Sequence, residues 1–205
     1  MARAFNRQQL LEAFDEIGSA AIAAGTRLDV AVYGGSALVL ASNFRFSTED
    51  VDIAEIELPW PEWLSNVVGQ IARRNDWSDS WFNDAVSFHL SPLAEPTRDL
   101  IAYGTFPRTT EAVGLTIFLP TPRYMLALKL KALRVSDFTK GTQDMADVAN
   151  LLHVLGITEV EQAIAILAAY FPISAAHADK ERYVVKQLLA RESPADASYK
   201  PRTDV

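Results

Sequence analysis

The chain has 205 residues and a formal net charge of −7 at pH 7, with 49% hydrophobic and 22% charged residues. These values are ordinary for a soluble globular protein with one sizeable domain, or with a core and an appended helical lobe. No apolar run reaches the length of a membrane span, and the N-terminus lacks the apolar stretch of a signal peptide. The absence of cysteine excludes disulfides, a thiol nucleophile and a cysteine-based zinc site, so we expect a cytoplasmic protein with no membrane contact.

The charge is unevenly distributed along the chain. Residues 1–100 carry a net charge of −8, and residues 101–205 carry a net charge of +1. An acidic protein does not attract nucleic acid through its overall charge, which argues against broad, non-specific DNA binding. Local docking of RNA along the second half is still compatible with this distribution.

The first 119 residues show the pattern of an α/β core with a mixed sheet. A helix is expected over 6–24, because Asn6 is a good N-cap, apolar residues then recur at helical spacing and Gly25 suits the C-terminal stop. Further helices are expected over 36–42 and 62–73. Strands are expected at Leu28–Tyr33, Val51–Ile56, Ala85–Leu90, Leu100–Tyr103 and Leu115–Leu119.

The pattern changes at Pro120. Thr121 can cap a helix that has Pro122 at its first position and runs to about Val135. Further helices are expected near 143–155, 159–170 and 178–191, and the polar tail is expected to be disordered. The predicted organisation is an α/β (α+β) core over 1–119, a helical lobe over 120–191 and a tail over 192–205.

One short region joins a small-residue turn to a pair of carboxylates. Gly34 and Gly35 let the backbone adopt positive φ and bring N–H groups close to an anion, and Ser36 adds a hydroxyl where a helix is expected to begin. Asp50 and Asp52 alternate with apolar residues, which on a strand puts both carboxylates on one face. Two hard oxygen ligands that face a phosphate-binding turn form a candidate Mg²⁺–nucleotide site.

This combination resembles the nucleotidyltransferase superfamily, whose signature is Gly-Gly or Gly-Ser followed by Asp-x-Asp. Its spacing is most similar to the AbiEii-type branch, the toxin arm of bacterial toxin–antitoxin pairs. In that branch Gly-Gly-x-Ala-Leu precedes Arg-x-Ser/Thr-x-Asp-x-Asp. The matching positions here are Gly34, Gly35, Ala37, Leu38, Arg45, Thr48, Asp50 and Asp52.

The resemblance implies a polymerase-β-like fold and a Mg²⁺ site, with two ions possible, that takes an NTP as donor. The aspartates would be the metal ligands. The triphosphate would lie against the residues of the glycine motif and its flanks, which are Gly34, Gly35, Ser36, Arg45 and Thr48.

A second segment extends the resemblance into the helical lobe. Lys129 lies in an apolar stripe, where a lysine is disfavoured unless it snorkels or meets an anion. The family pattern Leu-x-x-Lys-x-x-Ala, followed by Asp-x-x-Asp, is matched by Leu126, Lys129, Ala132, Asp144 and Asp147. By resemblance, Lys129 contacts the triphosphate, and Asp144 or Asp147 completes the site or orients the lysine.

Polymerase-type nucleotidyltransferases use a third carboxylate on a neighbouring strand. Asp99, which opens a predicted strand, is the first choice for this metal ligand and for the base that takes the proton of the attacking hydroxyl. Asp84, just before the strand expected over 85–90, is the alternative.

Simpler interpretations stay open for each motif. The glycine pair could be only a tight turn, Asp50 and Asp52 could be solvated, Arg45 could anchor its loop through an ion pair, and Lys129 could snorkel. The tryptophans could stack on nucleobases, but we expect them to pack an irregular segment onto the sheet. They are Trp60, Trp63, Trp77 and Trp81.

The expected reaction is transfer of a nucleoside monophosphate from an NTP to an acceptor hydroxyl, with release of pyrophosphate. By resemblance the acceptor is RNA, with tRNA as the leading candidate, and the protein partner is a winged-helix antitoxin. One rival is a small-molecule or protein nucleotidyltransferase of the aminoglycoside-modifying type. The other is a non-catalytic binding module on the same fold.

Overall fold

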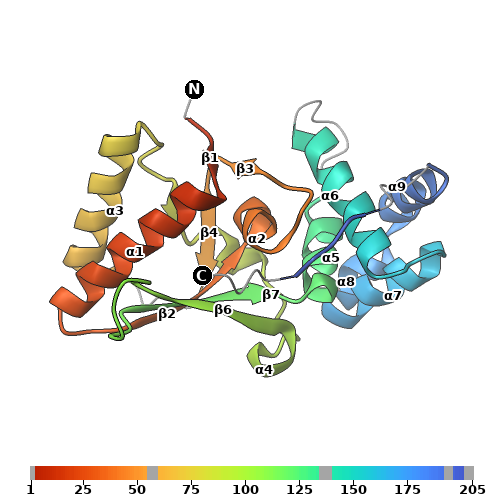
Figure 1. Ribbon diagram of the computed structural model, residues 1–205. Helices are drawn as coiled ribbons and strands as arrows, with labels where there is room; N and C mark the ends of the chain where they lie inside the picture. The colour runs from red at the N-terminus through yellow and green to blue at the C-terminus, as the bar shows by residue number, and fades with distance from the viewer. Residues whose placement is uncertain (1–2, 55–59, 134–139, 192–195, 201–205) are drawn as a thin grey trace.

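The computed structural model describes residues 3–54, 60–133, 140–191 and 196–200. Five strands form a central mixed sheet in the order β5-β4-β2-β7-β6 (Figure 1). They are β2 (Leu28–Tyr33), β4 (Val51–Ala54), β5 (Phe82–Asn83), β6 (Leu100–Phe106) and β7 (Leu115–Pro120). The pairs β2–β7 and β4–β5 are parallel, whereas β2–β4 and β6–β7 are antiparallel. A mixed sheet combined with helices confirms the expected α+β class.

Strand β2 occupies the centre of the sheet and leads directly into helix α2 (Gly34–Ala41). Its last four residues are all buried, as expected for a strand that is covered on both faces. The helix begins two residues before the expected start at Ser36, so the glycine pair forms its first turn. The N-terminus of α2 therefore lies at the end of the central strand.

Helices α1 (Arg7–Ala23) and α3 (Glu62–Asn75) pack against each other at one end of the molecule (Figure 1). Asn6 caps α1 as expected, because its Oδ1 accepts a hydrogen bond from the backbone N–H of Gln9 at 3.1 Å. Gly25 follows the helix with a φ of +68°, a value that favours glycine. Beside α1, strand β1 (Phe5–Asn6) pairs with β3 (Ser47–Thr48) in a separate two-stranded ladder.

The described chain after β7 is helical up to Leu189, as its periodicity indicates. Helix α5 (Pro122–Lys131) starts at its N-cap Thr121, whose Oγ1 accepts from the backbone N–H of Tyr124 at 3.3 Å. It is followed by α6 (Lys140–Val154), α7 (Val160–Tyr170), α8 (Pro172–Ala176) and α9 (Asp179–Leu189). Helix α5 packs against both α6 and α7 (Figure 1). None of the described helices is long and apolar enough to cross a membrane.

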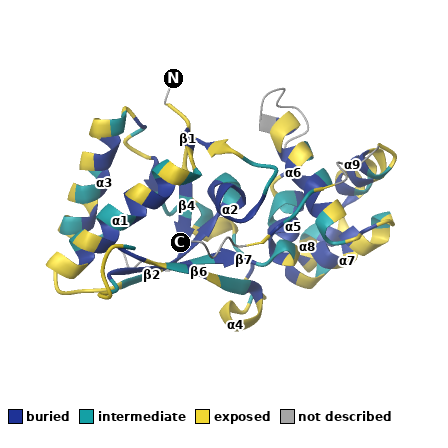
Figure 2. Cartoon of the chain, in the orientation of Figure 1, coloured by how far each residue is buried: buried dark blue, intermediate teal, exposed yellow. Residues whose placement is uncertain are grey.

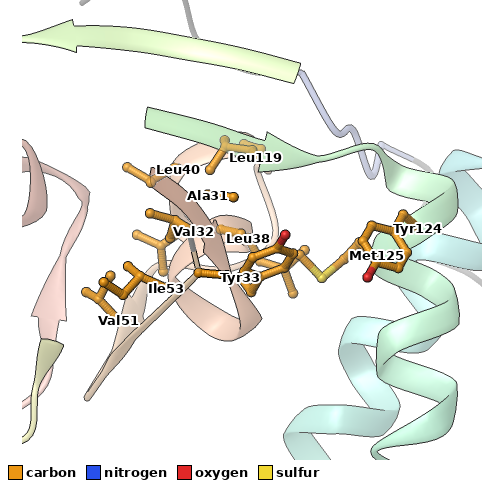
Figure 3. Packing of buried hydrophobic residues seen from close by; sticks show 14 of the residues in the cluster. Ala31, Val32, Tyr33, Leu38, Leu40, Val51, Ile53, Leu119, Tyr124 and Met125 are labelled. Carbon is orange, nitrogen blue, oxygen red and sulfur yellow. The ribbon is translucent and has the colours of Figure 1, made fainter. Parts of the chain in front are cut away.

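Buried side chains form one hydrophobic core that continues from the sheet into the helical lobe (Figure 2). At the junction the ring of Tyr33 on β2 meets the ring of Tyr124 on α5 edge to face, with centroids 6.4 Å apart (Figure 3). Tyr124 also packs against Tyr170 of α7, with ring centroids 4.8 Å apart. Such aromatic pairs contribute about 1 kcal/mol each beyond the burial of their area. The helical lobe is thus anchored on the strand that leads into α2.

The expected strand Ala85–Leu90 is wrong. The segment Ala85–His89 is instead a short 3₁₀ helix, η1, that follows β5, and none of its residues is buried. The Asn83 side-chain Oδ1 accepts a hydrogen bond from the backbone N–H of Ala85 at 3.0 Å, which turns the chain out of the strand direction.

The prediction of a disordered tail is wrong for residues 196–200. Tyr199 is buried, its hydroxyl donates to the carbonyl oxygen of Pro120 at 2.6 Å, and its backbone forms an antiparallel bridge with Ser42. The Lys200 N–H donates to the carbonyl oxygen of Ala41 at 2.7 Å. One large aromatic ring with backbone pairing thus holds an otherwise polar segment against the end of α2.

Some expectations fall outside the described residues. These are the end of the strand expected over 51–56, the end of the helix expected to run to about 135, and the tail positions 192–195 and 201–205.

Candidate functional site

The antiparallel register of β2 and β4 brings Asp52 to the first turn of α2. Asp52 pairs with Tyr33, the residue that precedes Gly34. A Cβ placed on Gly34 would lie 2.6 Å from the Asp52 Oδ2, and the φ of Gly34 is +64°. Only glycine allows the half-buried carboxylate of Asp52 to approach the backbone this closely.

The second glycine of the motif faces the segment that follows α2. A Cβ on Gly35 would lie 2.9 Å from the Thr48 Oγ1 and 3.2 Å from the Arg45 Nη2. The pairing of β1 with β3 holds Thr48 in place, opposite Phe5. The Thr48 hydroxyl also lies 3.3 Å from the Asp50 Oδ1 and 3.2 Å from the Asp50 carbonyl oxygen. The two expected carboxylates therefore reach the same helical turn, Asp52 directly and Asp50 through Thr48.

Arg45 and Lys129 meet at one buried carboxylate from the helical lobe. The Asp147 Oδ2 lies 3.2 Å from the Arg45 Nη1 and 2.8 Å from the Lys129 Nζ. The Lys129 Nζ also lies 3.2 Å from the Asp144 Oδ1. Two cations and two carboxylates therefore balance in one network, in which the Asp147 side chain is 1% exposed. Burial of these charges is tolerated because each has a partner of opposite sign.

This network joins the two halves of the molecule. Arg45 also donates through Nε to the carbonyl oxygen of Ser47 at 2.9 Å, which fixes its guanidinium between β3 and α6. Gln143 donates to Asp147 from one turn earlier on α6, at 3.2 Å. Sequence reasoning missed Gln143, although its i, i+4 spacing to Asp147 on a helix was a usable signal. The contact of Arg45 with Asp147, 102 positions apart, leaves no such signal in one sequence.

Ser36 lies in the same turn but its hydroxyl points inward. The side chain is fully buried, and Oγ donates to the carbonyl oxygen of Tyr33 at 2.8 Å. Its proton is therefore used within the helix start. In this arrangement Ser36 stabilises the first turn of α2.

Asp99, by contrast, is placed away from this group. It ends the short helix α4 (Pro96–Asp99) and precedes β6, which is separated from β4 by β7 and β2. Leu100 pairs with Pro120 at the same end of the sheet as Asp52. Three strand spacings nevertheless correspond to about 14 Å between the two positions. The structure does not bring Asp99 together with Asp50 and Asp52.

The carboxylate of Asp99 is also fully engaged. It accepts hydrogen bonds from the Arg98 Nη2 at 2.7 Å, the Tyr170 hydroxyl at 2.7 Å and the backbone N–H of Glu95 at 2.8 Å. Burial alone would raise the pKa of Asp99, but these hydrogen bonds outweigh it and hold the pKa below its usual value. A carboxylate that is already ionised and saturated with donors is a poor proton acceptor, so Asp99 acts as an anchor for α7.

Asp84, the alternative to Asp99, follows β5, the strand beside β4. Strand β5 pairs in parallel with β4, with Asn83 opposite Asp52, and Asp84 follows directly at the start of η1. Within the described ranges no group of three His, Asp or Glu side chains lies close enough to hold a metal ion. Asp52 lies on β4 and Asp50 directly precedes it, and Asp84 follows the neighbouring strand without closing a three-carboxylate cluster among the described residues.

Trp77 and Trp81 pack in the interior, as expected, and are the most deeply buried of the tryptophans. Trp77 and Trp81 pack on each other and on Phe5, with Trp81 fully buried. They support the β1–β3 ladder that carries Thr48.

Comparison of the whole chain with protein-family models, with curated protein sequences and with solved structures finds no match.

Proposed function

We propose that the chain is a Mg²⁺-dependent nucleotidyltransferase that moves a nucleoside monophosphate from an NTP to an acceptor hydroxyl. The observation that supports this most is the first turn of α2, where two glycines let Asp52 on one side and Thr48 and Arg45 on the other approach the backbone closely. A helix N-terminus without side chains offers N–H groups to phosphate oxygens. Carboxylates beside the same turn are suited to the cation that accompanies a triphosphate.

The charged side chains fall into two groups, one suited to phosphate and one suited to Mg²⁺. Arg45 borders the turn through its Nη2 and can meet phosphate oxygens there, while its Nη1 and the Lys129 Nζ are held by Asp147. Asp50 and Asp52 present hard oxygen donors, which is the chemistry that Mg²⁺ prefers, so the residues fit the ion. When bound, the ion would neutralise charge on the phosphate oxygens.

The proposed transfer is a displacement at the α-phosphorus. The acceptor oxygen forms a bond to that phosphorus, the bond from it to the bridging oxygen of the β-phosphate breaks, and pyrophosphate leaves. The proton of the acceptor hydroxyl passes to a carboxylate base. We assign this role to Asp84, because it borders β4 while Asp99 is saturated with donors.

The resemblance suggests RNA, with tRNA as the leading candidate, as acceptor, and an AbiEii-like toxin that is paired with a winged-helix antitoxin. A small-molecule acceptor of the aminoglycoside type is the rival with support from charge, because residues 1–100 carry a net charge of −8 and would attract a cationic acceptor. A nucleotide-binding module without transfer is supported by the missing third carboxylate among the described residues.

Transfer from each NTP, labelled with ³²P at the α-phosphate, into total bacterial RNA tests the proposal. The wild type is compared with the double variant Asp50→Ala/Asp52→Ala and with Glu49→Ala, a matched change at the neighbouring exposed carboxylate. We expect label in RNA with the wild type and Glu49→Ala, and none with the double variant.

The other outcomes separate the rivals. If the protein binds Mg²⁺–NTP but does not label RNA, the acceptor is a small molecule or a protein, or the chain only binds the nucleotide. A labelling assay with a cationic small molecule decides between a small-molecule acceptor and the other two. Absence of NTP binding by the wild type would overturn the enzyme proposal. Equal labelling by the double variant would overturn the assigned site.

A further inference from the structure

A few large hydrophobic side chains of the described residues are strongly exposed, and two of them are phenylalanines on segments that carry candidate site residues. Phe46 is 75% exposed and directly follows Arg45, and Phe88 is 88% exposed and lies in η1, four residues after Asp84. The tryptophans Trp77 and Trp81, by contrast, are buried in the core. Among the described residues, these two phenylalanines are the strongly exposed aromatic rings on the segments that carry Arg45 and Asp84.

Phe46 is held in its exposed position by its neighbours. The Arg45 Nε donates to the carbonyl oxygen of Ser47 at 2.9 Å, so the arginine side chain spans the residue between them. Ser47 and Thr48 then enter the β1–β3 ladder. The backbone on both sides of Phe46 is thus fixed, and its exposed ring belongs to the residue that follows Arg45, whose guanidinium borders Gly35.

Phe88 is fixed in a comparable way. The hydrogen bond from the Ala85 N–H to the Asn83 side chain starts the turn of η1, and the carbonyl oxygen of His89 accepts from the Lys131 Nζ at 3.0 Å. The segment therefore contacts β4 at its start and α5 at its end. An anchored backbone loses little conformational freedom when its side chain binds a ligand, which favours recognition.

The sequence neighbours of the two rings favour a nucleobase over a protein partner. Phe46 lies between Arg45 and Ser47, and Phe88 lies between Ser87 and His89, so neither ring extends into an apolar stretch of its own segment. Protein interfaces need a contiguous desolvated patch. Nucleobases need only a ring face with positive charge nearby for the phosphates, which Arg45 provides at Phe46.

We propose that Phe46 and Phe88 are stacking positions for the nucleobases of a nucleotide, or of an unpaired strand, whose phosphates are held at the first turn of α2. This inference rests on the proposed function. The base can come from the NTP donor or from the acceptor RNA, and both present the same flat ring to a phenylalanine.

The test measures binding of two fluorescent probes in the presence of Mg²⁺: 2-aminopurine riboside triphosphate, and a short single-stranded RNA that contains 2-aminopurine. Fluorescence of this base is quenched when it stacks. The full chain is studied as wild type, Phe46→Ala, Phe88→Ala, Phe46→Trp and Tyr183→Ala. Tyr183, 65% exposed on α9 on the far side of the helical lobe, is the control for removal of an exposed ring (Figure 1).

We expect each phenylalanine-to-alanine change to weaken one probe by about 10-fold and to remove its quenching. Phe46→Trp should keep both properties, and Tyr183→Ala should match the wild type. The probe that is affected identifies the source of the base. Since these rings are exposed, the melting temperature should not change.

Two different results would contradict the stacking inference and the proposed function. If both alanine variants bind the probes as tightly as the wild type and quench them fully, the stacking inference is overturned and the proposed function still stands. Wild-type protein that binds neither the triphosphate nor the RNA would overturn the proposed function itself.

Discussion

Asp52 and Asp99 are two buried or half-buried carboxylates at the same end of the sheet. Their surroundings differ, and the difference makes Asp52 a candidate for ligand binding and Asp99 a structural residue. Asp52 lies against the first turn of α2, where its Oδ2 occupies the space that a Cβ on Gly34 would take. Asp99 is 2% exposed and receives donors from Arg98, Tyr170 and the backbone of Glu95. A carboxylate whose acceptor capacity is filled stabilises the fold, whereas one beside a helix N-terminus can bind a ligand. The predictions below test this contrast.

Replacement of Asp52 should have the largest effect, and the effect should be on activity. We expect Asp52→Ala to lower Mg²⁺-dependent transfer or NTP binding by about 100-fold or more, because a charged group that faces the phosphates is lost. Its melting temperature should stay close to that of the wild type. Initial rates and differential scanning calorimetry measure the two quantities. A large loss of stability with normal activity per folded molecule would reverse the assignment of Asp52.

Replacement of Asp99 should show the opposite pattern. Asp99→Asn weakens the hydrogen bonds from Arg98 and Tyr170, so we expect a loss of about 2 kcal/mol in the free energy of unfolding. In a chain of this size that corresponds to a melting temperature lower by about 5 °C. Activity per folded molecule should be unchanged. A kcat that falls by orders of magnitude at full stability would return Asp99 to the catalytic site.

Alanine substitutions at Gly34 and Gly25 separate the loss of stability caused by backbone strain from the loss of binding caused by a blocked site. Gly34 and Gly25 have φ values of +64° and +68°, but only a Cβ on Gly34 would meet the Asp52 carboxylate, and nothing lies within 4 Å of one on Gly25. Alanine at either position should destabilise the fold by about 1 kcal/mol. We expect only Gly34→Ala to impair NTP binding, by about 10-fold. If the two variants bind NTP equally well, the first turn of α2 is not part of the binding site.

High pH should loosen the junction around Asp99. Burial, together with the hydrogen bond to Asp99, raises the pKa of Tyr170 to about 12, and burial raises the pKa of Tyr124. A raised pKa means that the stabilisation is complete below the unfolded value of about 10 and is lost as the pH rises towards 12. Urea unfolding at pH values across this range should show falling stability. Tyr170→Phe should be less stable at neutral pH but lose less on going to high pH.

The smallest effect is expected from the C-terminal segment. Tyr199→Phe removes one hydrogen bond to the carbonyl oxygen of Pro120, which should cost about 1 kcal/mol of stability. Asn43, two residues before Arg45, exchanges hydrogen bonds with Asp196 and Ser198 in the same segment. We therefore also expect a modest rise in KM for the NTP. Thermal unfolding and steady-state kinetics measure the two changes, and no change in either would show that the segment is dispensable.

Local features of the sequence predicted most of the elements. The Asn6 cap, the Thr121–Pro122 helix start and the buried run of β2 depend on interactions within a few residues, and all appear in the structure. The prediction of a strand over Ala85–Leu90 failed because the Asn83 side chain accepts a hydrogen bond from the Ala85 N–H and turns the chain. The prediction of a disordered tail failed for Tyr199 because its hydroxyl donates to Pro120 and its backbone pairs with Ser42, both remote in sequence.

The sequence by itself determined the candidate residues within each motif: the glycine pair, the alternating aspartates and the lysine in an apolar stripe. Their spacing along a strand or helix is a local property of the backbone. Only the tertiary structure decided which motifs meet. The order of strands in the sheet places Asp84 rather than Asp99 beside β4, and helix packing places Asp147 against Arg45. Strand order and helix contacts arise from burial across the whole chain, and no local pattern encodes them.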